Sequence, residues 1–191
     1  MKKIIIIFVA IILSLNLMNA QKQRLSIGYG VYGLEDLFLT LSFLSSNIST
    51  GTVEGNTDPS CIVGPLTISY HRVLELYERF SFGGSLTYDH YKYASRENNK
   101  DVFGFNSFTL APEGKFKYLN PENKFNIYAL IGMGCTVLFF NNYKDKHTDT
   151  IGHLNLQFTP LGLEYGRNVK GFLELGVGYK GIISGGISVS L

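Results

Sequence analysis

The strongest constraint on the fold is a regular alternation of apolar and polar side chains over long segments. In 80–90 one set is Phe80, Phe82, Gly84, Leu86 and Tyr88, and the other is Ser81, Gly83, Ser85, Thr87 and Asp89. Segment 104–118 alternates Phe108, Leu110, Pro112, Phe116 and Tyr118 with Ser107, Thr109, Ala111, Glu113, Lys115 and Lys117. A period of two places alternate side chains on opposite faces of a β-strand. The sequence therefore predicts strands with one apolar and one polar face.

Eight segments of this kind follow residue 20. They lie at about 24–33, 63–73, 79–93, 103–118, 124–140, 151–165, 170–180 and 182–191. Short turns follow the second, fourth and sixth segments, whereas longer polar loops at 34–62, 94–102 and 141–150 follow the first, third and fifth. The last connection, near Lys180 and Gly181, is also short and breaks this alternation. Short turns at one end and long loops at the other are typical of a transmembrane β-barrel. We therefore predict an all-β domain over 21–191, an eight-stranded antiparallel up-and-down transmembrane barrel.

Alternation alone does not distinguish this barrel from a soluble sandwich, whose polar face lies in water. Several segments reach the length that a tilted membrane strand needs, and Lys, Arg, Asp and Glu are nearly absent from the apolar faces. A water-exposed face would carry many more charges. Aromatic residues near segment ends suggest membrane-interface girdles: Tyr29, Tyr32, Tyr88, Tyr91, Tyr93, Phe116, Tyr118, Phe139, Phe140, Tyr165 and Tyr179. These features favour the membrane barrel.

Residues 1–20 have the anatomy of a secretory signal peptide. Lys2 and Lys3 precede an apolar run at 4–15, and Ala20 offers a small residue before a cut. The run is short for a membrane-spanning helix. Cleavage would leave 15 of the 17 Lys and Arg against 15 Asp and Glu. The exported chain would be formally neutral, which does not support nucleic-acid binding.

Glu164 and Glu174 lie within an otherwise apolar, glycine-rich ending at 159–191. The interior of an eight-stranded barrel is filled by side chains, and polar groups there must pair. We therefore predict a lumen charge cluster of Glu113, Lys115, Lys117, Glu164 and Glu174. A salt-bridge cluster that serves packing is one interpretation, and a proton or ion path is the other.

Proline cannot donate to a β-ladder, so Pro160 is expected to mark a bulge. Before Pro160 the odd-numbered side chains would face the lumen. After Pro160 the even-numbered positions Gly162 and Glu164 would face it. Along 172–179 we expect Phe172, Glu174, Gly176 and Gly178 in the lumen, and Leu173, Leu175, Val177 and Tyr179 outside.

The signal, the eight-segment meander and the ending TPLGLEYG…GFLELGVGYKGIISGGISVSL resemble small outer-membrane β-barrel proteins of Gram-negative bacteria, of the OmpA/OmpX-like type. The final segment keeps Ile187, Val189 and Leu191 on one face. In that family such a pattern is read by the barrel-assembly machinery, although the last residue is commonly Phe. The resemblance implies an outer-membrane location among lipids and lipopolysaccharide. It does not define one activity, since members range from anchors to adhesins to narrow pores.

Segment 34–48 alternates differently from the rest. Leu34, Leu37, Phe38, Leu41, Leu44 and Ile48 recur at helical spacing. Glu35 and Asp36 stand near its start, where a helix dipole favours acids. We expect either a short amphipathic helix in the first loop, capping the barrel or lying in the membrane interface, or a longer first strand. Cys61 and Cys135 could form a disulfide in an exported protein.

No residues with metal-ligand or cofactor spacing stand out, and we expect neither group. The four histidines are not spaced with each other or with Cys as metal ligands are. The best enzyme-like set is His90 beside Asp89, with Ser85 and Ser95 nearby, and it is a weak one. The leading hypothesis is a non-enzymatic surface barrel whose loops carry a structural, interaction or adhesion role toward an unknown extracellular partner. The alternatives are a narrow porin-like channel, a lipid-modifying enzyme and a soluble lipocalin-like carrier.

Overall fold

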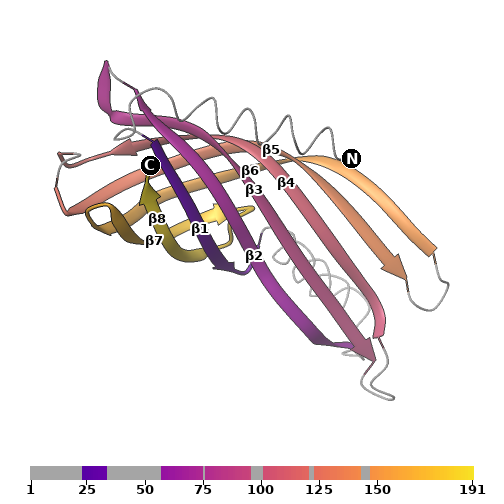
Figure 1. Cartoon of the computed structure of the whole chain (residues 1–191). Coiled ribbons are helices and arrows are strands. Elements are labelled where there is room, and N and C mark those ends of the chain that lie inside the picture. Colours follow the sequence, from indigo (N-terminus) through magenta and orange to yellow (C-terminus); the bar gives the residue numbers. More distant parts are fainter. Residues whose placement is uncertain (1–22, 34–56, 75, 96–100, 121–122, 143–146) are drawn as a thin grey trace.

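The computed structural model is an eight-stranded antiparallel barrel in which each strand pairs with its neighbour in sequence and β8 closes on β1 (Figure 1). It describes residues 23–33, 57–74, 76–95, 101–120, 123–142 and 147–191. The strands are β1 (Gln23–Val31), β2 (Thr57–Leu74), β3 (Tyr77–Ser95), β4 (Asp101–Lys117), β5 (Phe125–Asn142), β6 (His147–Gly166), β7 (Val169–Gly178) and β8 (Ile183–Ser190). The predicted fold class and all eight strands are confirmed.

Strand length divides the barrel into two parts. Strands β1, β7 and β8 have 9, 10 and 8 residues, whereas β2 to β6 have 17 to 20. The first predicted loop is therefore shorter than expected, because β2 begins at Thr57. We call the end with the β2–β3, β4–β5 and β6–β7 connections the turn end, and the other the loop end. The five longer strands continue beyond the three short ones toward the loop end (Figure 1).

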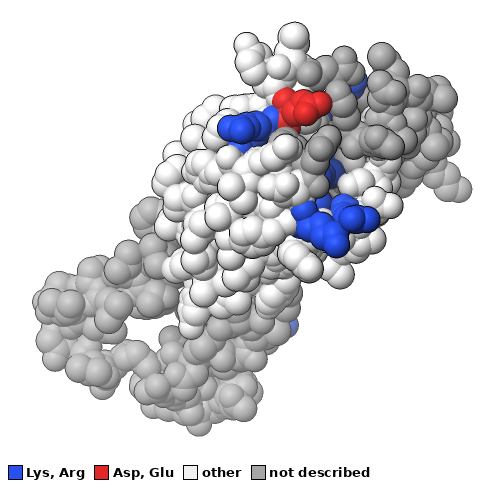
Figure 2. Space-filling model, turned by 90° about the vertical axis from the view of Figure 1, so that its left-hand side faces the viewer, with Lys and Arg blue, Asp and Glu red and all other residues white. Residues whose placement is uncertain are grey.

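Burial is inverted relative to a water-soluble core. Large apolar side chains are exposed on the outer wall, as with Leu110 at 67% and Leu154 at 73%. Polar side chains fill the interior, as with Thr159 at 0% and Gln157 at 1%. The predicted faces of 80–90 and 104–118 are confirmed. Figure 2, which views the molecule from the left-hand side of Figure 1, shows charges as a few small groups on a mostly white surface.

The bulge predicted at Pro160 is present. The register of β6 against β7 shifts between Phe158 and Leu161, and its register against β5 shifts between Tyr128 and Leu130. Thr159 and Glu164 are both buried, although they differ in parity along the strand. A bulge inserts one residue and so reverses which parity faces inward. This reversal is what places the Glu164 carboxylate in the lumen.

Two aromatic residues predicted for the outer girdles lie inside, which corrects that prediction. Tyr179 is 2% exposed, because β7 ends at Gly178, whose φ of 147° turns the chain before the next side chain. Tyr91 is fully buried and its ring lies 4.8 Å from that of Phe105. Other members of the set, such as Tyr29 and Tyr165, are exposed on the outer wall as expected.

Some predictions fall on residues that the structure does not describe. The signal peptide at 1–20 and the helix at 34–48 both lie outside the described residues. Among the described residues, no helix has the length and apolar character needed to cross a bilayer.

Candidate functional site

The turn end of the lumen is organised around one carboxylate. Glu164, near the end of β6, contacts four cationic side chains from three other strands, β1, β4 and β7. The nitrogen–oxygen distances are 3.1 Å to Arg24, 3.2 Å to Lys115, 3.0 Å to Lys117 and 2.9 Å to Lys170. Arg24 directs Nη1 at both oxygens of the carboxylate. The Glu164 side chain is 1% exposed, so the cluster ties β1, β4, β6 and β7 together inside the barrel.

A second cluster surrounds Glu113 on β4. Lys180 Nζ lies 2.8 Å from Oε1 and His71 Nε2 lies 3.0 Å from Oε2. The hydroxyls of Ser85 and Tyr179 each donate to Oε1 at 2.7 Å. The carboxylate therefore has partners from β2, β3 and the β7–β8 turn. Hydrogen bonds to a buried charge offset the cost of removing it from water.

Glu174 on β7 forms the third centre. Tyr128 donates its hydroxyl proton to Oε1 at 2.8 Å, and Ser184 donates to Oε2 at 3.3 Å. Lys180 Nζ lies 3.9 Å from Oε2 and so links this centre to Glu113. The Tyr128 ring in turn lies under Lys115 Nζ, 3.4 Å from the ring centroid. The three carboxylates thus form one continuous network across the lumen.

All five side chains of the predicted charge cluster lie in this network. Sequence reasoning missed six further titratable members, Arg24, His71, Lys170, Lys180, Tyr128 and Tyr179, besides the hydroxyls of Ser85 and Ser184. Arg24, Lys170 and Lys180 stand at strand ends, where a charge is normally solvated. The signal that could have identified Arg24 and Lys170 is parity, since each falls on the inward positions of its strand.

The interior is packed rather than open. Three of its cavities measure about 10, 10 and 20 Å³, each roughly the size needed for one water. Gly162 shows how closely the network is fitted, because a Cβ there would overlap the Tyr128 ring. The small residue on β6 thus makes room for the large one on β5.

Gly162→Ala is expected to lower the free energy of unfolding by about 1–3 kcal/mol, the usual range for overpacking a filled interior. The added methyl must displace the Tyr128 ring and with it the hydrogen bond to Glu174. Urea unfolding of the refolded protein, followed by circular dichroism, measures the change.

Gly171→Ala is the matched control, because a Cβ at that outward position meets nothing within 4 Å. The control should be within about 0.5 kcal/mol of the unaltered protein. Equal stability of the two variants would contradict the close fit between Gly162 and Tyr128.

The other candidate residues do not come together. Asp89 and Ser85 face the lumen, whereas His90 lies on the outer wall, where its Nδ1 is 2.7 Å from Asn106 Oδ1. The enzyme-like set therefore spans two faces of β3. Cys135 is a free cysteine exposed on the outer wall of β5, so the proposed disulfide with Cys61 is not formed.

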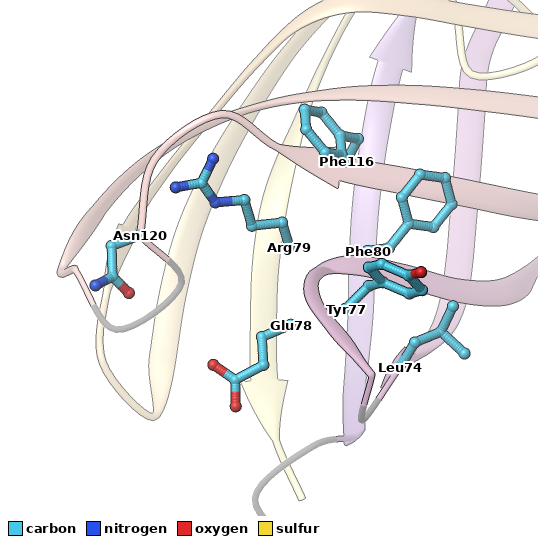
Figure 3. Close-up of a pocket in the computed structure, with 7 residues that line it drawn as sticks. All are labelled: Leu74, Tyr77, Glu78, Arg79, Phe80, Phe116 and Asn120. Atoms are coloured by element: carbon cyan, nitrogen blue, oxygen red, sulfur yellow. The ribbon is translucent and has the colours of Figure 1, made fainter.

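A concave region of about 760 Å³ lies at the turn end. Figure 3 shows Leu74, Tyr77, Phe80 and Phe116 on one side of it and Glu78, Arg79 and Asn120 on the other. The Phe80 and Phe116 rings lie 5.9 Å apart. The region marks where the apolar outer wall gives way to polar side chains.

Fold and lumen together define the class of this protein: an eight-stranded up-and-down β-barrel with an apolar outer wall and a filled, ion-paired interior. No protein-family model matches the chain, and a search of curated proteins finds no match.

Proposed function

We propose that this chain is an integral outer-membrane β-barrel that anchors a surface-exposed platform with a structural, interaction or adhesion role. The observation that carries the proposal is the outer wall. On β4 its outward positions are Phe116, Gly114, Pro112, Leu110 and Phe108, followed by the first polar residue, Asn106. A wall of this kind is stable only against hydrocarbon or a large partner, because exposed apolar patches of such extent are rare on soluble proteins.

The long strands support the second half of the proposal. A tilted strand crosses a bilayer with about 9–11 residues, which is close to the length of β1, β7 and β8. Strands β2 to β6 are longer by several residues, and their surplus lies at the loop end. In the described sheet, β6 pairs with β7 only from Gln157 onward and β2 with β1 only from Leu66 to Arg72. The surplus is thus an open five-stranded sheet beyond the closed barrel.

The filled lumen favours an anchor over a conduit. Its three carboxylates hold the walls together through side chains of seven strands, and the cavities named above are no larger than about 20 Å³. With the turn end in the periplasm and the loop end outside, the partners would be outer-membrane lipids and lipopolysaccharide, the assembly machinery during biogenesis, and an extracellular partner at the platform.

The protein, expressed as the full chain, is expected in the outer-membrane fraction and to require detergent for extraction. Unboiled, it should migrate as a compact species on a denaturing gel, and boiling should convert it to the unfolded position. A closed barrel whose wall binds detergent resists unfolding at room temperature.

Recovery in the soluble fraction, with the same gel migration for boiled and unboiled samples, would contradict the proposed membrane location. That outcome would instead support a soluble carrier.

A further inference from the structure

The charged side chains at the turn end of the lumen do not balance. Among the described residues, four cations contact the carboxylate of Glu164. Over the described part of the network, these four and Lys180 make five cations against the three carboxylates of Glu113, Glu164 and Glu174, which leaves two positive charges in excess. Like charges held this close in a low-dielectric interior repel strongly. An additional negative group among them would relieve that repulsion.

A cavity of about 10 Å³ lies beside these cations, and none of the described residues that line it is a carboxylate. Six of its lining residues carry N–H or O–H donors: Arg24, Lys115, Lys117, Ser26, Ser81 and Ser188. Arginine and lysine donate only, and a serine hydroxyl rotates to donate where an acceptor is present. The remaining two are a valine and His71, whose Nε2 is engaged with Glu113 at 3.0 Å. Such a lining suits an acceptor that carries negative charge.

Lys117 carries an unused donor into this cavity. Its side chain is 3% exposed and its Nζ lies 3.0 Å from Glu164 Oε1. The same oxygen is also contacted by Arg24 and Lys170, and beyond this ion pair Lys117 Nζ has no hydrogen-bond partner among the described residues. An ammonium has three donors, so donors beyond the ion pair with Glu164 remain unmet, which is costly in a buried position.

We propose that this donor-lined cavity binds one monatomic anion, chloride being the abundant case. The cavity is about as large as the space that one bound water needs, so a halide, which is larger than water, enters when Arg24 and Lys115 move outward. These two side chains are 18% and 14% exposed, so the site opens toward the turn end. Sulfate and phosphate are too large for the space. The bound anion neutralises one excess charge and accepts from Lys117 and the serine hydroxyls.

The test uses the full chain folded in detergent micelles. Its thermal unfolding midpoint is measured as sodium gluconate is replaced by sodium chloride, by sodium bromide or by sodium sulfate at constant ionic strength. Chloride and bromide should raise the midpoint along a saturating curve, because a ligand bound only by the folded state stabilises it. Sulfate should give no saturable rise over gluconate. Identical midpoints in chloride and gluconate would overturn the proposal.

Lys117→Met should raise the half-saturating chloride concentration by about tenfold or more, since it removes a charge-assisted hydrogen bond. Lys170→Met is the matched control, because it removes the same charge from the same carboxylate but does not line the cavity. That control should keep the saturable chloride response. An equal loss in both variants would mean general screening of the cluster and would overturn a discrete site.

A second measurement keeps the proposal testable if Lys117→Met does not fold. Crystals of the unaltered protein grown in bromide should show an anomalous peak within contact distance of Lys117 Nζ and the Ser81 and Ser188 hydroxyls. Absence of a peak there, with bromide bound elsewhere or not at all, would overturn the assignment.

Discussion

Glu164→Gln is expected to lower the free energy of unfolding by about 3–5 kcal/mol, the range for removing one partner of a buried ion pair. The substitution keeps the shape of the side chain and removes the negative charge that Arg24, Lys115, Lys117 and Lys170 all contact. Four mutually repelling cations would then remain in a closed interior. Because a domain is stable by only about 5–15 kcal/mol, the compact form should unfold at much lower urea concentration or fail to form.

Glu78→Gln is a suitable control, since Glu78 is exposed at the turn end. It should change stability by less than about 0.5 kcal/mol. The double variant Glu164→Gln with Lys117→Met should recover part of the loss, because it removes one of the four unneutralised cations. A double variant no better than the single one, or a Glu164→Gln protein as stable as Glu78→Gln, would refute the central role of this carboxylate.

Leu110→Arg is expected to cost about 2–4 kcal/mol when the protein is folded in a bilayer, the range for a cation at the middle of a barrel's lipid-facing wall. Leu110 is 67% exposed and lies on the outer wall of β4 between Phe116 and Asn106. In water the same substitution at so exposed a position would be nearly neutral. The free energy of unfolding from lipid vesicles, measured by urea titration, therefore reports what surrounds the wall.

Leu76→Arg is the control for Leu110→Arg, because it makes the same substitution at a leucine outside the barrel wall. Leu76 lies in the β2–β3 turn and is 90% exposed, which places it in water under the proposed orientation. Its substitution should leave the midpoint of unfolding unchanged. If both variants prove neutral in vesicles, hydrocarbon does not contact Leu110 and the proposed membrane location is wrong.

The alternation of apolar and polar side chains allowed the fold to be predicted from the sequence. Each strand places one set of side chains inside the barrel and the other set outside. The period of two therefore predicts, for every residue in a strand, which face it occupies. The one place where the period is broken was also predictable. Pro160 removes a ladder donor, and the bulge there explains why both Thr159 and Glu164 are buried.

Which side chains pair within the network was harder to predict from the sequence. His71 is separated from Glu113 by two strand connections, and Arg24 from Glu164 by 140 residues, yet the barrel brings each pair within 3.1 Å. Tyr179 was assigned to the wrong face because the parity argument was carried one residue beyond Gly178, where the strand ends. Odd or even position in a strand predicts whether a side chain faces the lumen or the outer wall, but not its height along the barrel axis. The rule no longer applies where the strand ends in a turn.

The amino-acid sequence by itself determined that this protein is a two-faced β meander of eight strands with charged groups on its inner face. That information is local, since it depends on residues two apart in a strand. Only the tertiary structure decided which charges meet, because closure of β8 on β1 and the stagger between strands set the height of each side chain in the lumen. The excess of positive charge around Glu164 is therefore a property of the closed barrel, produced when the ends of β1, β4, β6 and β7 converge at one level.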